Sequence, residues 1–241
     1  MQSQSRTETL IAAALLSCGL AAGGYFIGQT MFNAKVAINT ADVKGLAERR
    51  VKANRAYWKI DYTVSGTDRA KMPALYEESE TAQQAVIDLL LESGFEQAEI
   101  APGIINYLHR EFRDDDQKLV EEKHLLVGSV EVETDRVQLL FEVRSKMNKL
   151  IARGLDIKNN PPAYHFTNLN DIKPEMVKEA TTNARVAANE FAENAGVKVG
   201  GIRSARQGGF VIRDVGENYG DTKKIDKDVR VVTNVTFYLT K

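Results

Sequence analysis

Cysteine is almost absent from this sequence, and its scarcity excludes several kinds of site. The chain of 241 residues has a single cysteine, Cys18, so no disulfide can form within one chain. This only cysteine lies inside an apolar run, so the rest of the chain has no cysteine that could act as a nucleophile. A strong net charge is also absent, since 32 lysines and arginines balance 33 aspartates and glutamates. We therefore expect no nucleic-acid partner, because such partners select basic surfaces.

Catalytic and metal-binding motifs are missing as well. His109, His124 and His165 show neither HxxxH nor HxH spacing, so a zinc site would need folding alone to bring them together. The run Asp114–Asp116 lacks the alternating ligands of a calcium loop and is typical of a solvated hairpin turn. Neither a GxSxG motif nor a phosphate-binding glycine motif occurs. We predict a non-enzymatic protein with no catalytic residues, no metal and no cofactor.

The most prominent feature that the sequence does contain is one long apolar run. Leu10–Phe32 carries no charged residue, and a membrane-spanning helix needs about 20 apolar residues. The apolar core of a cleaved signal peptide is shorter, about 7–15 residues. No second run of this kind follows. We predict a membrane anchor over 10–32, an N-terminal tail over 1–9, a linker over 33–42 and one folded domain over 43–241.

Two other interpretations of the apolar run stay open. Leu15–Cys18 has residue types that precede a lipidated cysteine, and Ala21–Gly23 offers small residues for cleavage. Neither interpretation explains why the apolar residues continue to Phe32. The side of the membrane is also open, because basic residues such as Lys35 and Lys44 follow the run. The excess of lysine and arginine after the run, taken alone, favours a cytoplasmic domain, but large domains translocate largely regardless of charge.

Glycines inside the run indicate that anchors associate with one another. Small residues spaced four apart let two helices approach closely within a bilayer. The candidate residues are Gly19, Gly23, Gly24 and Gly28. A simpler interpretation also holds, because glycine and alanine are common in membrane helices.

The rest of the chain alternates between strand and helix patterns. Apolar residues at every second position predict strands, and apolar residues at helical spacing predict helices. The expected strands cover 43–66, 99–112, 123–133, 163–169, 197–206 and 229–239, and the expected helices cover 72–94, 138–153 and 175–194. The order β-α-β-β-α-β-α-β-β predicts an α+β fold of helices layered on antiparallel or mixed sheet. We expect a buried Trp58, an inward Ile151, and a last-helix core face of Met176, Ala180, Ala184, Ala187 and Phe191.

The same residues carry a family resemblance. Val43–Glu48 opens a strand, Ala82–Gly94 closes a helix, and Ala180–Ile202 joins alanines at helical spacing to the paired glycines that begin the next strand. These blocks resemble the SIMPL-domain family, and the resemblance covers essentially everything after the anchor. It implies a bacterial envelope protein of the type linked to oxidative stress or immunogenicity, some of whose relatives form channel-like oligomers. It implies no set of catalytic residues.

The polar segment Gly208–Asp228 is the best location for a binding or assembly loop, because long connections carry function more often than the elements they join. Its candidate residues are Arg213, Asp214, Glu217, Asn218, Tyr219 and Asp221. The resulting expectation is a stress-related homo-oligomer anchored in the bacterial inner membrane, with its domain facing the periplasm or the cell exterior. Two alternatives remain: a module that binds a small ligand or a partner protein through this loop, and an enzyme that activates water on a metal near Asp114 and Asp116.

Overall fold

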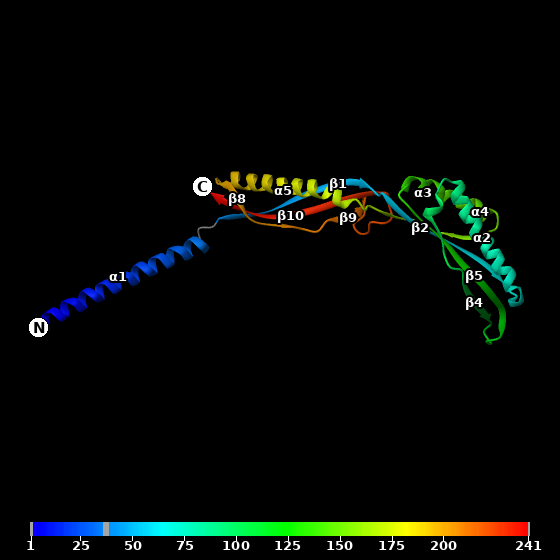
Figure 1. Ribbon diagram of the computed structural model, residues 1–241, viewed down its shortest axis with the longest axis horizontal. Helices are drawn as coiled ribbons and strands as arrows, with labels where there is room; N and C mark the ends of the chain where they lie inside the picture. Colours follow the sequence, from blue (N-terminus) through cyan, green and yellow to red (C-terminus); the bar gives the residue numbers. More distant parts are fainter. Residues whose placement is uncertain (1, 36–38, 241) are drawn as a thin grey trace. The chain divides into compact units, whose positions relative to one another are not determined.

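The computed structural model describes residues 2–35 and 39–240 and contains both helices and sheets (Figure 1). The described chain divides into two compact units. The first unit comprises Met1–Ala47, Glu175–Gly209 and Val231–Lys241, and the second comprises Glu48–Pro174 and Phe210–Arg230. The α+β class predicted from the sequence is confirmed. Residues 36–38 of the expected linker, and the terminal residues 1 and 241, lie outside the described residues.

The N-terminal apolar run is helical. Helix α1 covers Gln2–Lys35 and is drawn in blue in Figure 1. Its segment Glu8–Phe32 is long and apolar enough to cross a membrane. Large apolar side chains are exposed along this segment, among them Leu10, Leu20 and Phe26. A helix that exposes apolar side chains all round is typical of a lipid environment.

The first unit is built on a sheet with the strand order β1-β10-β8, in which β9 also pairs with β10. The bounds are β1 Thr40–Lys52, β8 Lys198–Gln207, β9 Val211–Asp214 and β10 Asp226–Thr240. Strand β8 runs antiparallel to β10, with register shifts beside Phe237. The β9–β10 pairing belongs to the second unit.

Helix α5, Leu169–Asn194, covers a face of this sheet with a stripe of small residues. Its buried residues are Met176, Ala180, Ala184, Ala188 and Ala192. Of the expected inward positions, Phe191 is wrong, since it is 55% exposed, and Ala187 is only half-buried, with the neighbouring Ala188 buried in its place. Alanines four residues apart drift slowly around a helix and leave its backbone close to the sheet. The aromatic ring expected inside therefore lies outside.

The second unit contains a sheet with the strand order β3-β5-β2-β6, to which β4 adds along β5 and β7 along β2. The bounds are β2 Arg55–Gly66, β3 Ile100–Pro102, β4 Asn106–Arg113, β5 Leu119–Thr134, β6 Asp156–Asn159 and β7 Ala163–His165. Its helices are α2 Met72–Glu92, α3 Val137–Val143 and α4 Asn148–Ala152, with single 3₁₀ turns at Arg69–Lys71, Gln97–Glu99 and Arg144–Met147.

The main core lies between this sheet and its helices. Trp58 is 1% exposed, as expected, and its indole Nε1–H donates a hydrogen bond to the carbonyl oxygen of Asn160 at 2.9 Å. The helix expected over 138–153 is broken by a 3₁₀ turn. As a result Ile151, expected inside, is 44% exposed, while Leu150 is buried.

The first expected strand, 43–66, is two strands that belong to different sheets. The chain changes sheet at Ala53 and Asn54, whose backbone N–H groups donate to the carbonyl oxygens of Ile225 and His165 at 2.7 and 3.0 Å. The region expected as one strand over 99–112 is likewise two strands, β3 and β4. Alternation alone does not reveal such breaks, because the pattern continues on both sides of them.

Candidate functional site

The segment Gly208–Asp228 folds around a buried ion pair. Asp214, at the end of β9, pairs with Lys227 in β10, and both side chains are buried. The Lys227 ammonium also donates to the carbonyl oxygen of Asp221 at 2.6 Å. The Asp214 carboxylate accepts backbone N–H bonds from Lys223 and Lys224 at 2.8 and 3.1 Å. Asp214 and Asp221 therefore hold the segment together from within.

This environment shifts the ionisation of Asp214. Burial by itself raises the pKa of a carboxyl group, because it penalises the charged form. Here the hydrogen bond from Lys227 and the two backbone N–H groups outweigh burial and lower the pKa of Asp214 below its ordinary value. Asp214 therefore remains ionised at neutral pH as a structural anion.

The other candidate residues of the segment lie at its surface. Arg213 and Glu217 line a hollow of about 420 Å³ in the second unit. Tyr219 is 90% exposed, and Asn218 beside it is exposed too. Ion pairs occupy much of the charge around the hollow, namely Arg50–Asp228 at 3.0 Å, Arg230–Glu48 at 3.4 Å and Lys224–Glu217 at 3.0 Å. The six residues thus do not converge on one point.

The anchor glycines present an open helix surface. A Cβ atom added at Gly19, Gly23, Gly24 or Gly28 would meet no atom within 4 Å. Cys18 is exposed on the same helix. This surface leaves room for the close helix approach that the glycine spacing predicts.

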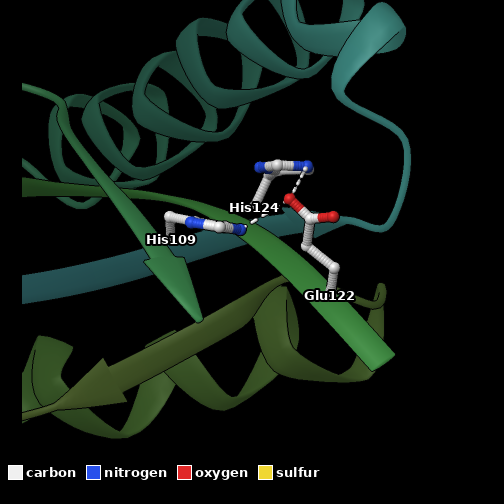
Figure 2. Close-up of side chains that lie close together, drawn as sticks. All are labelled: His109, Glu122 and His124. Carbon is white, nitrogen blue, oxygen red and sulfur yellow. Dashed lines mark hydrogen bonds and ion pairs between the residues drawn. The ribbon is translucent and has the colours of Figure 1, made fainter. Parts of the chain in front are cut away.

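Folding brings together two of the histidines that the sequence places on separate elements. In the β4–β5 hairpin, His109 lies directly opposite His124. Their rings stack with centroids 5.1 Å apart, and Glu122 lies beside both (Figure 2). The Glu122 Oε1 atom lies 2.6 Å from His109 Nε2 and 3.5 Å from His124 Nε2. His165 is not part of this cluster.

The surroundings of the two histidines differ. His124 is 2% exposed, and its Nδ1 atom lies 2.8 Å from the Tyr107 hydroxyl. His109 and Glu122 each have 37% of the side chain exposed. Ligand atoms of His109, Glu122 and His124 all lie within 4.8 Å of one another, and this is the cluster of metal-ligating type found among the described residues. In the sequence, the signal for this cluster is the number of residues between each histidine and the hairpin turn. That number, together with the strand register, decides that His109 and His124 face each other.

The acidic run near these residues forms the tip of the same hairpin. One Asp114 carboxylate oxygen accepts the backbone N–H groups of Asp116 and Lys118 at 3.1 and 2.9 Å. Gln117 has a positive φ of 64°, as tight turns require. The hairpin turn predicted here is confirmed by this geometry.

Comparison with known proteins identifies the domain. Residues 41–237 match the model of the SIMPL family, which is described as a protein of unknown function (DUF541). The match spans both units. A search of curated proteins finds no match.

Proposed function

The chain belongs to the SIMPL family, and on that basis we propose that it is a non-enzymatic, membrane-anchored envelope protein that assembles with copies of itself. The observation that carries this proposal is the free edge of its sheet at β4. Strand β4 pairs with β5 and with no other described strand. Every residue of β4 is exposed. An exposed strand edge is a template for pairing with another chain.

Apolar side chains near this edge favour a protein partner over water. Ile104 is 82% exposed, Val120 is 67% exposed, and Leu108 and Phe112 are each 45% exposed. All four belong to the hairpin region of the second unit. The partner we propose is the β4 strand of a second copy, because antiparallel addition would extend the sheet and cover these side chains.

A second exposed edge supports the same function. All residues of β8 except Val199 and Gly200 are exposed, and β8 pairs with β10 alone among the described strands. Helix α1 would raise the local concentration of copies by confining them to a membrane, so that weak contacts suffice. The glycine surface of α1 offers a further contact within the bilayer.

We place the anchor in the bacterial inner membrane, with the domain on the periplasmic side, and propose a role in the stress response. Support for both comes from the family resemblance, whereas the basic residues after the helix favour the opposite side. Protease added to spheroplasts should digest the domain while cytoplasmic markers survive. Protection of a domain that the protease cuts after membrane lysis would reverse the orientation.

A cross-linking experiment tests the β4 edge. In a Cys18→Ser background, Arg110→Cys places a thiol near the middle of β4, where antiparallel pairing brings two copies together. Oxidation of intact membranes should give a covalent dimer. The matched control is Glu190→Cys on the exposed surface of α5, which should stay monomeric. Equal cross-linking of both variants, or of neither, would contradict assembly through β4.

A second candidate is a binding module at Gly208–Asp228. The observation that favours it is Tyr219, an aromatic side chain that is 90% exposed on the segment closed by the buried Asp214–Lys227 pair. Exposed aromatic side chains are frequent anchors of interfaces. If this segment binds the partner, Tyr219→Ala should abolish function while leaving assembly intact.

A further inference from the structure

Three side chains on the β4–β5 hairpin are fixed on one face by backbone pairing. The register places His109 opposite His124 and Glu111 opposite Glu122. Because side chains alternate between faces along a strand, Glu122 and His124 share a face two residues apart. The positions of His109, Glu122 and His124 therefore depend on strand pairing and not on a loop.

Both imidazole rings direct the same type of atom toward the same oxygen. The Nε2 atoms of His109 and His124 lie 2.6 and 3.5 Å from Glu122 Oε1. The rings are nearly parallel, with an interplanar angle of 11°. Figure 2 shows the Glu122 carboxylate beside both rings. One ligand atom from each of the three side chains thus lies within 4.8 Å of the other two.

The remaining nitrogen of the buried histidine has its own partner. Tyr107 Oη lies 2.8 Å from His124 Nδ1. When the Nδ1–H donates to this hydroxyl, Nε2 carries a free lone pair that faces Glu122 and His109. A hydrogen bond at the second ring nitrogen is the usual way in which proteins orient a metal-binding histidine.

The charges on this face are compatible with a bound cation. Glu111 lies opposite Glu122 in the register and forms an ion pair with Arg113 at 2.6 Å. Lys123, on the opposite face of β5, pairs with Glu121 at 3.2 Å.

We propose that His109, Glu122 and His124 bind a zinc ion. Two imidazole nitrogens and one carboxylate oxygen form a ligand set that suits Zn²⁺, and three protein ligands leave a fourth position for water. Ligand atoms of a tetrahedral zinc site lie about 3.3 Å apart, given bonds of roughly 2.0–2.1 Å. The 3.5 Å separation from His124 fits already. The 2.6 Å separation from His109 must widen, and the His109 ring must turn out of its stacked orientation so that both nitrogen lone pairs face one ion. His109 lies on the edge strand β4 and is partly exposed, so its ring has room to turn.

Titration calorimetry with Zn²⁺ tests the proposal on the full-length protein in detergent, prepared without a polyhistidine tag. One zinc ion should bind per chain. His109→Ala and Glu122→Gln should each weaken binding at least about tenfold, and Tyr107→Phe by up to about tenfold, as loss of an orienting partner does. The first two positions are partly exposed, so these variants should keep the wild-type circular dichroism spectrum.

Matched controls separate this site from general metal binding. His165→Ala removes the histidine outside the cluster, and Asp115→Asn removes an acidic side chain from the hairpin tip. Both should bind zinc as the wild type does. Co²⁺ should give the intense visible absorption of tetrahedral coordination in the wild type and not in His109→Ala. Absence of stoichiometric zinc binding, or equal affinity in His109→Ala and His165→Ala, would overturn the proposal.

Discussion

Asp214 and Lys227 form an ion pair inside the second unit, with side chains that are 1% and 0% exposed. The pair joins β9 to the start of β10 across the segment in which we expected a binding loop. A buried pair of this kind contributes little to stability compared with an apolar pair. Loss of one partner, however, leaves the other as a buried charge without compensation. The pair therefore explains how a long polar segment keeps a defined shape.

The first prediction concerns this pair. Lys227→Met should lower the free energy of unfolding by about 3–5 kcal/mol, because Asp214 would remain buried without its partner. The double variant Asp214→Asn, Lys227→Met should recover much of that loss. Urea unfolding followed by the fluorescence of Trp58, the only tryptophan, measures both effects. If the double variant were as unstable as Lys227→Met, the loss of stability could not be attributed to an uncompensated charge on Asp214.

The second prediction is a dependence of stability on pH. The pKa of Asp214 is lowered in the folded protein, so the unfolded chain binds the proton more readily. The resulting stability is present above the ordinary aspartate pKa of about 3.9 and is lost as the pH falls through the lower folded value. The double variant should lose less stability than the wild type over that acidic range. Identical slopes of unfolding free energy against pH would show that Asp214 does not contribute.

The third prediction concerns the packing of α5 on β1 in the first unit. A Cβ atom at Gly45 would lie 1.8 Å from the Ala180 carbonyl oxygen, which is part of the helix backbone. Gly45→Ala should therefore push the helix off the sheet and cost about 1–3 kcal/mol or more. Gly201→Ala is the matched control, since its Cβ would meet no atom within 4 Å. Thermal unfolding by circular dichroism should separate the two variants, and equal melting temperatures would contradict this packing.

Much of the fold follows from periodicity in the sequence. The helices α2 and α5 and the strands β5 and β10 each show one clear period over many residues, the apolar run is apolar throughout its length, and all appear in the structure. The face of α5 was assigned less well. The alanine stripe competes with the larger Phe191, and only packing against the sheet decides which of them lies inside.

The two polar features of the second unit depend on information that periodicity lacks. His109 faces His124 only because the strands pair in one register, and a shift of one residue would move a histidine to the other face. The burial of Lys227, in contrast, could be predicted from the sequence pattern. This lysine occupies an inward position of β10 together with Val229 and Val231, and a charge at such a position indicates a buried partner.

The mass of the full-length protein in detergent tests the central claim, self-assembly, most directly. Light scattering should give a discrete multiple of the 26.8 kDa chain. Leu108→Lys on β4 should lower that multiple, whereas Val186→Lys on the exposed surface of α5 should leave it unchanged. A strictly monomeric wild-type protein at high micromolar concentration would contradict the account.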